Sequence, residues 1–118
     1  METTIKVARS VFEANESMAR RNQSRMNEAG VLSLNLMSAP GSGKTTLLQR
    51  SMARLAPERS AVLVGDLQTS RDADRLASDA VEVCQINTGK GCHLTARQVS
   101  DGLLQLRLEQ ISYLFIEN

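Results

Sequence analysis

The feature that most constrains the fold is an alternating apolar segment that runs into a glycine-rich loop and then into a helical pattern. Residues 31–37, VLSLNLM, alternate leucine with polar residues, and a period of two is typical of a strand. The loop SAPGSGKTT follows, and TTLLQRSMARL then places apolar residues at helical spacing. A strand and a helix joined in this way predict an α/β fold with a mostly parallel sheet flanked by helices.

The rest of the chain continues the alternation of strands and helices. The pattern predicts a helix over about 4–29, strands at 60–64, 81–86 and 111–118, a short helix at 71–78 and a longer one over about 95–109. Asn15 and Asn22 interrupt the apolar stripe of the N-terminal helix. We therefore expect that helix to pack with only part of its length.

The last predicted strand ends at the C-terminus, and no helix follows it. A strand as apolar as this one belongs inside a parallel sheet, and both faces of such a sheet need covering helices. We therefore expect the C-terminal part of the sheet to be missing from the chain. We also expect the final strand to leave apolar surface and an unpaired edge exposed.

Composition narrows the classes of function. The net charge is +1, with 14 basic and 13 acidic residues, so composition favours neither nucleic acid nor an anionic membrane as partner. Aromatic residues are only 3%, which disfavours base-stacking surfaces. The sequence contains no signal-peptide pattern and no apolar run near the roughly 20 residues of a spanning helix. Two cysteines favour reduced thiols in a cytoplasmic protein over a disulfide framework.

The glycine-rich loop has the composition of a phosphate-binding loop. Gly41 and Gly43 let successive backbone N–H groups turn toward a phosphate, in front of the positive end of the following helix. Lys44 can reach the outer phosphates, and the Thr45 hydroxyl suits Mg²⁺. Ser38 stands where the pattern GxxxxGK[S/T] has its first glycine, so the match is incomplete. The alternative is a flexible turn that caps a helix, and the flanking strand and helix disfavour it.

Two further carboxylates follow predicted strands, and ligands of open α/β sheets bind at the carboxyl ends of strands. Asp66 is placed to bind the metal or to position a water, and capping of the next helix is an equally good interpretation. Glu117 is placed to hold Mg²⁺ in a nucleotidase, with a solvated terminal carboxylate as the alternative. We interpret Asp72 and Asp74 as residues of a first helical turn.

The loop INTGKGCHLTA sets Cys92 beside His93, the only histidine of the chain. A thiolate and an imidazole suit Zn²⁺ or Ni²⁺, and the alternative is a loop thiol beside a solvated imidazole. One pair cannot complete a four-coordinate site. Either a third ligand lies in the missing segment, or two chains each contribute a pair, or both. Cys84, in the middle of a predicted strand, is interpreted as a small buried core residue.

Four segments in this order, LNLMSAPGSGKTTLL, GDLQTSRDADR, QINTGKGCHLTA and LFIEN, resemble the GTPase domain of the HypB family of hydrogenase maturation proteins. The resemblance covers the whole chain. It implies a P-loop GTPase of the SIMIBI class that binds and hydrolyses GTP and helps to insert nickel into [NiFe]-hydrogenase. It also implies GTP, Mg²⁺ and Ni²⁺ or Zn²⁺ as cofactors. We accordingly expect an N-terminal helix at 1–30 and an incomplete P-loop GTPase domain at 31–118.

The resemblance assigns roles to individual residues. Nucleotide contacts are implied for Gly41, Ser42, Gly43, Lys44, Thr45 and Thr46. Mg²⁺ would be held by Thr45, Asp66 and Glu117, and catalysis would involve Lys44 and Asp66, which falls in the family's switch region. Cys92 and His93 match the family's metal-binding pair, whose third ligand is a cysteine just beyond an ExxG pattern that Glu117 opens.

The resemblance also implies a nucleotide-linked homodimer with the metal site at its interface. The implied partners are the hydrogenase large subunit and other maturation proteins in the cytoplasm, without nucleic acid or membrane. The guanine-reading NKxD element does not occur in the sequence, so the preference for GTP over ATP rests on the resemblance. Two alternatives remain open: another P-loop ATPase or kinase, and a non-catalytic module for nickel binding, storage or docking.

Overall fold

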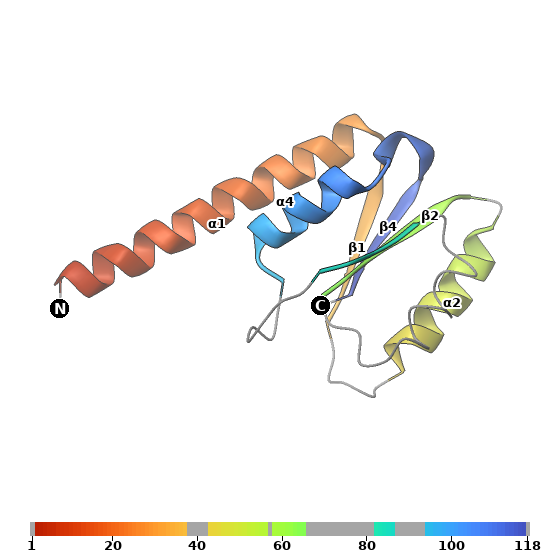
Figure 1. The fold of residues 1–118 in the computed structure, drawn as a ribbon, viewed down its shortest axis with the longest axis horizontal. Helices are drawn as coiled ribbons and strands as arrows, with labels where there is room; N and C mark the ends of the chain where they lie inside the picture. The colour runs from red at the N-terminus through yellow and green to blue at the C-terminus, as the bar shows by residue number, and fades with distance from the viewer. Residues whose placement is uncertain (1, 38–42, 57, 66–81, 87–93, 118) are drawn as a thin grey trace.

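The computed structural model describes residues 2–37, 43–56, 58–65, 82–86 and 94–117. The helices and strands follow one another in the predicted order within these ranges (Figure 1). In chain order the elements are α1 (Glu2–Glu28), β1 (Leu32–Leu36), α2 (Lys44–Leu55), β2 (Ser60–Val64), β3 (Glu82–Gln85), α4 (Ala96–Gln105), a 3₁₀ turn (Leu108–Gln110) and β4 (Tyr113–Glu117). The helix predicted at 71–78 lies outside the described residues.

The prediction of one helix over 95–109 is wrong at its C-terminal end. The helix α4 stops at Gln105, because Leu106 adopts an extended backbone with φ −99° and ψ 149°. The side chains of Leu106, Leu108 and Ile111 are all buried in one core cluster. The break in the helix lets these three side chains reach the same core.

The four strands form a parallel sheet in the order β1–β4–β2–β3. The last strand in sequence, β4, therefore lies inside the sheet, as predicted, and is hydrogen-bonded on both sides. The expectation that it leaves an unpaired edge is wrong, because the outer strands of the described sheet are β1 and β3. Within the described sheet, the large apolar residues that are exposed lie on the outer strand β1, where Leu32 and Leu34 are 57% and 41% exposed.

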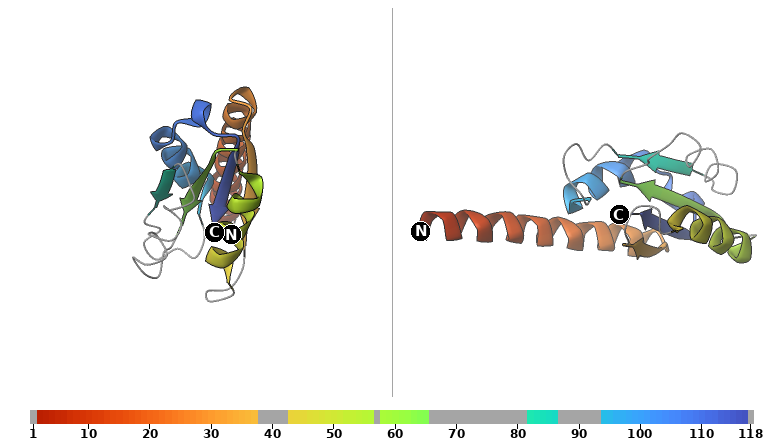
Figure 2. Two further views of the ribbon diagram at one scale, coloured as in Figure 1. Left: turned by 90° about the vertical axis from the view of Figure 1, so that its right-hand side faces the viewer. Right: turned by 90° about the horizontal axis from the view of Figure 1, so that it is seen from below.

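Helices cover both faces of this sheet (Figures 1 and 2). The helices α1 and α4 lie side by side on one face, and α2 lies on the other. Apolar residues of β2 and β4 point alternately to the two faces and form two clusters. The cluster on the α1 and α4 side includes Met26, Leu63, Leu103, Leu114 and Ile116, and the cluster on the α2 side includes Leu48, Met52, Val62, Val64 and Phe115.

The long helix α1 packs with only part of its length, which confirms the prediction from its interrupted stripe. Its C-terminal half lies along α4, whereas its N-terminal half extends past the rest of the molecule (Figure 2). Met26 near its C-terminus is buried, while Val11 and Phe12 are about two-thirds exposed. Within the described ranges, no helix is both long enough and apolar enough to cross a membrane.

Gly102 lies inside α4, where glycine costs about 1 kcal/mol relative to alanine. A Cβ atom at this position would lie 2.4 Å from Cδ1 of Leu63 and 2.8 Å from Cδ1 of Ile86. Leu63 is fully buried, so its side chain has little room to move. The missing side chain therefore allows α4 to lie close to β2.

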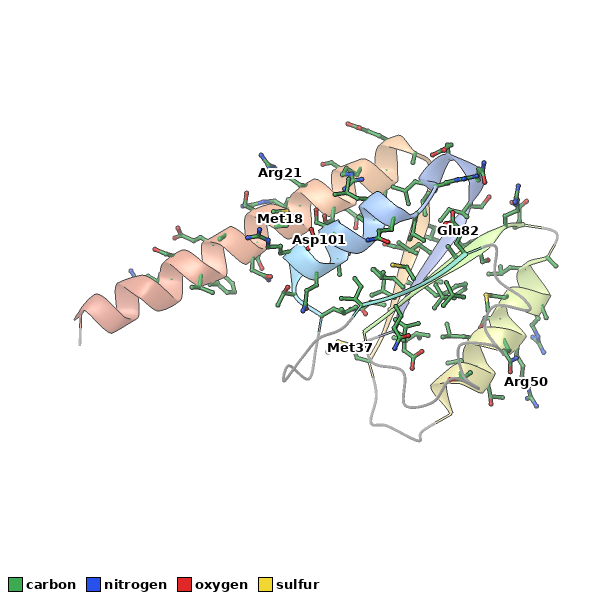
Figure 3. The ribbon with its side chains drawn as sticks, viewed as in Figure 1. Met18, Arg21, Met37, Arg50, Glu82 and Asp101 are labelled. Carbon is green, nitrogen blue, oxygen red and sulfur yellow. The ribbon has the colours of Figure 1, made fainter. Side chains whose placement is uncertain are left out.

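We predict that Gly102→Ala lowers the free energy of unfolding by about 1–3 kcal/mol, the range for overpacked cores. The added methyl group has no space against Leu63 and Ile86, and this cost exceeds the gain from the higher helix propensity of alanine. The control is Asp101→Ala at the exposed neighbouring position of α4 (Figure 3), which should change the free energy of unfolding by less than about 0.5 kcal/mol. Urea unfolding followed by circular dichroism measures both variants. A Gly102→Ala midpoint equal to or above that of the wild type would contradict the close packing of α4 on β2.

Candidate functional site

The carboxyl ends of the four parallel strands lie along one edge of the sheet. The register places Glu117 of β4 between Leu36 of β1 and Val64 of β2, and places Gln85 of β3 beside Val64. In the sequence, β1 is followed by the glycine-rich loop, β2 by the segment that contains Asp66, and β3 by the segment that contains Cys92 and His93. Glu117 therefore lies between the strand that leads into the glycine-rich loop and the strand that leads to Asp66.

The Glu117 side chain is buried, with 7% of its surface exposed. It is therefore not a solvated terminal carboxylate. Phe115, two residues earlier, packs in the cluster on the α2 side, so the alternation of a strand directs Glu117 to that same side. A buried carboxylate on the side of the helix that follows the glycine-rich loop provides hard oxygen ligands of the kind that Mg²⁺ prefers.

The turn at Gly43 introduces α2. Gly43 adopts the left-handed conformation, with φ 92° and ψ 20°, which glycine tolerates far better than other residues. Its carbonyl oxygen accepts a hydrogen bond from Leu47 N at 3.0 Å and so begins the helix. The N-cap residue Gly43 has no side chain that could cap α2, and no acidic residue lies in the first turn of this helix. A helix start of this kind, with the positive end of the helix dipole, favours the binding of a phosphate.

The residues that follow Gly43 form the first turn of α2. Lys44 is the first helical residue, Thr45 is half-buried and Thr46 is exposed. The structure thus brings four of the predicted phosphate-loop positions together at the start of one helix. Gly41 and Ser42, which precede this turn, lie outside the described residues.

Asp66, Cys92 and His93 also lie outside the described residues, but the residues next to them are described. Gly65 precedes Asp66, is buried, and donates a hydrogen bond from its N–H to Glu117 O at 3.0 Å. Leu94 follows His93 and packs on Gly65 so closely that a Cβ there would lie 2.8 Å from Cγ of Leu94. The segment that leads to Asp66 therefore touches the segment that follows the cysteine–histidine pair.

The sequence analysis did not predict the contact between Gly65 and Leu94. The one local feature that could have indicated it is the glycine directly after the apolar strand 60–64, because a glycine allows another side chain to approach the backbone closely. Within the described ranges, no group of three or more histidine, cysteine, aspartate or glutamate side chains could hold a metal ion. A metal site at Cys92 and His93 therefore stays a prediction.

Cys84 lies in the middle of β3, opposite Leu63, and packs against the core on the α1 and α4 side, as predicted. It is half-buried rather than fully buried. Burial raises the pKa of its thiol, and the carboxylate of Glu82 raises this pKa further. The backbone N–H of Arg107 holds the Glu82 side chain in place by donating a hydrogen bond to its Oε1 at 3.0 Å. A thiol that stays protonated is a poor metal ligand.

Comparison with known proteins identifies a family that this chain matches. Residues 32–118 match the nucleotide-binding domain of the CobW/HypB/UreG family. The chain is 45% identical over 109 residues to the hydrogenase maturation factor HypB of Escherichia coli strain K12, covering 92% of this chain and 38% of that protein. It is 41% identical over 119 residues to the hydrogenase/urease maturation factor HypB of Helicobacter hepaticus, covering 98% of this chain and 49% of that protein. The chain thus spans half or less of the length of these relatives.

Two solved structures share the fold. The crystal structure of HypB from Helicobacter pylori in complex with nickel superposes with a TM-score of 0.77 at 41% identity, over 88% of this chain and 50% of that one. HypB from Archaeoglobus fulgidus superposes with a TM-score of 0.81 at 31% identity, over 90% of this chain and 52% of that one. The predicted fold class, a P-loop NTPase with a parallel sheet and flanking helices, is confirmed.

The raised pKa predicts that the Cys84 thiol is alkylated slowly near neutral pH. Its reaction rate with iodoacetamide should rise with pH through a midpoint above the ordinary pKa of a cysteine thiol. Mass spectrometry of the peptide that carries Cys84 measures the rate at each pH. Glu82→Gln keeps an oxygen that can accept the Arg107 hydrogen bond but removes the charge, so it should lower the midpoint. A midpoint that stays the same or rises in this variant would contradict the influence of Glu82.

Proposed function

The chain belongs to the CobW/HypB/UreG family of nucleotide-binding domains, and from this premise we propose that it binds and hydrolyses GTP as a metallochaperone in [NiFe]-hydrogenase maturation. The observation that carries the proposal is the left-handed Gly43 directly before the N-terminus of α2, a helix whose first turn contains no acidic residue, at the carboxyl edge of a parallel sheet. The similar curated proteins are hydrogenase maturation factors. The activity of the whole protein is part of the proposal, because the chain spans half or less of those relatives.

Binding of the GTP phosphates would use the first turn of α2. The first N–H groups of a helix have no partner within the helix, so they suit phosphate oxygens. The absence of an acidic residue from this turn supports that assignment, because a carboxylate there would repel the nucleotide. Lys44 is proposed to contact the outer phosphates, and Gly41, Ser42 and Thr46 complete the set of nucleotide-binding residues.

Thr45, Asp66 and Glu117 are proposed to hold Mg²⁺. Hydroxyl and carboxylate oxygens suit this ion, and the order of the strands supports the grouping. Glu117 ends β4, β2 on one side leads to Asp66, and β1 on the other side leads to the turn before Thr45. When bound, Mg²⁺ supplies positive charge that neutralises the phosphate oxygens as charge develops on them.

Hydrolysis is a matter of positioning and charge neutralisation. A water oxygen attacks the γ-phosphorus, the bond between this phosphorus and the bridging oxygen breaks, and GDP and inorganic phosphate form. Asp66 is proposed to orient the attacking water, whose proton leaves to the phosphate or to solvent. Lys44 is proposed to stabilise the negative charge that develops on the phosphate oxygens.

Nickel or zinc is the cargo in this proposal, and Cys92 and His93 are its ligands. A thiolate with a neutral imidazole suits either ion. A pair needs further ligands to complete the coordination, and a second copy of the chain in a nucleotide-linked homodimer could supply them. The proposed partners are the hydrogenase large subunit and other maturation proteins, and the proposed location is the cytoplasm. The contact of Leu94 with Gly65 supports a link between the cargo and the nucleotide, since each residue is the sequence neighbour of a proposed functional residue.

We predict that Lys44→Ala weakens GDP binding by about 1.5–3 kcal/mol, the range for hydrogen bonds to charged groups, and abolishes phosphate release from GTP. Titration calorimetry measures the affinity, and a phosphate-release assay measures turnover. Arg50→Ala removes a positive charge from the same helix at an exposed position that points away from the sheet (Figure 3), so it should leave both unchanged.

An unchanged affinity in Lys44→Ala would refute the phosphate-loop assignment. Wild-type turnover no higher than that of Lys44→Ala would indicate a non-catalytic module. A preference for ATP over GTP in the same assay would identify a different P-loop enzyme.

We also predict that Cys92→Ala and His93→Ala each lower the affinity for Ni²⁺ and Zn²⁺, whereas Cys84→Ala does not. Affinity in the wild type should fall as the pH falls, because protons compete for the thiolate and the imidazole. It should also differ between the GDP-bound protein and the protein with a non-hydrolysable GTP analogue, by a coupling on the order of 1–3 kcal/mol. A competition titration with a metallochromic dye measures all of these quantities.

Equal metal affinity in the wild type and both loop variants would refute the ligand assignment. Equal metal affinity in the two nucleotide states would leave the ligand assignment intact and would refute the coupling between nucleotide and metal.

A further inference from the structure

The long helix α1 has one face that packs within the fold and one that does not. On the packed face, Asn15 Oδ1 accepts a hydrogen bond from Ala96 N at 3.0 Å, and Asn22 Nδ2 donates one to Ala96 O at 2.8 Å. Met26 on the same face is buried in the core. The opposite face lines an open hollow with a volume of about 510 Å³. We call it the arginine face, and its residues are Ser17, Arg20, Arg21, Ser24, Arg25 and Glu28.

Four residues of the arginine face form one row along the helix. Successive members of this row are four, three and four residues apart, which is the spacing at which one helix packs against another. The row consists of Ser17, Arg21, Ser24 and Glu28. At 3.6 residues per turn, Arg20 and Arg25 lie on the two sides of the row. The small serines leave room between the arginines for the side chains of a second helix.

The charge of the arginine face is not balanced by the fold. Its three arginines form no ion pair within the described residues. Arg21 and Arg25 are four residues apart, a spacing at which like charges repel and disfavour a helix. Figure 3 shows Arg21 on the side of α1 that faces away from α4. Glu13 and Glu16 precede the hollow and do not line it. The face is therefore locally positive on a chain whose net charge is only +1.

We propose that the arginine face is a docking surface for an acidic helix of a partner protein. Carboxylates of that helix would reach Arg20 on one side of the row and Arg25 on the other, and a guanidinium group can bind a carboxylate through two parallel hydrogen bonds. Arginine is also enriched in protein interfaces.

Glu28 decides between a protein and a polyanion as the partner. Its carboxylate lines the same hollow as the arginines, so it repels the uniform negative charge of a nucleic acid or an anionic membrane. A helix can instead place a neutral or basic side chain opposite Glu28, which also fixes its direction along α1. The inference is independent of the proposed function, because no residue of the arginine face is assigned to the nucleotide or to the metal.

The probe for this surface is a fluorescein-labelled, alanine-rich helical peptide with glutamates one turn apart, and the same peptide with glutamines is its control. Fluorescence anisotropy with the intact protein measures both affinities. The glutamate peptide should bind, and its affinity should fall as the NaCl concentration rises, because salt screens exposed charges. The glutamine peptide should bind about tenfold more weakly, since exposed ion pairs contribute modestly one by one.

The double variant Arg21→Glu with Arg25→Glu tests the charge of the arginine face. It should bind the glutamate peptide about tenfold more weakly than the wild type, because attraction becomes repulsion at two positions. Arg50→Glu with Arg54→Glu is the matched control. It changes the net charge equally, at two arginines that are also four residues apart on a helix, and should keep the wild-type affinity.

The variant Ser24→Phe tests the packing of a second helix, because it fills the hollow without a change of charge. It should weaken the binding of the glutamate peptide. Ser10→Phe is its control, at an exposed serine of α1 seven residues before Ser17 and outside the hollow, and should bind like the wild type. All these positions lie outside the core clusters, and circular dichroism checks that each variant is folded.

Absence of binding of the glutamate peptide, or wild-type affinity in the Arg21 and Arg25 variant, would overturn the inference. An equal loss in the Arg50 and Arg54 variant would overturn it too, since net charge alone would then account for binding. Wild-type affinity in Ser24→Phe would refute the packing of a helix on this face. Tighter binding of polyuridylate RNA or of phosphatidylserine vesicles, lost in the Arg21 and Arg25 variant, would refute the assignment to a protein partner.

Discussion

The pairing of β4 with β1 on one side and β2 on the other is the interaction on which the rest of the structure depends. This strand joins the two strands that lead into the glycine-rich loop and to Asp66. Its side chains alternate between the two faces, with Leu114 and Ile116 in one core cluster and Phe115 in the other. Since all four strands are parallel, their carboxyl ends meet at one edge, and the candidate site lies there.

The two faces of the sheet carry different parts of the proposed function. The α2 face bears the turn at Gly43 and the buried Glu117, both suited to phosphate and Mg²⁺. The opposite face bears α4, whose first residues follow the cysteine–histidine pair and contact α1. The two sets of residues meet where Leu94 packs on Gly65. The coupling of nucleotide and metal ion that we propose would use this contact.

The spacing of apolar residues predicted most of the helices and strands, because this spacing shows which residues of one element face the core together. The strand 60–64 matches its predicted bounds, since five small and apolar residues there are buried on both faces. The helix predicted over 95–109 failed where three apolar side chains after Gln105 reach a core that only the tertiary fold defines. The expectation that β4 leaves an unpaired edge failed for a related reason, because the order of the strands in a sheet is not encoded in the period of a strand.

By itself, the sequence determined the order of strands and helices, the parallel α/β class and the glycine turn before α2. These features follow from the periodicity of apolar residues and from the backbone preferences of glycine, which act between neighbours in the chain. Only the tertiary structure decided that β4 pairs with β1 and β2, that Glu117 is buried and that Gly102 allows α4 to approach β2. It also decided that Asn15 and Asn22 hold Ala96 across 81 and 74 residues of chain. Contacts of that range arise from the packing of whole elements, which no local pattern specifies.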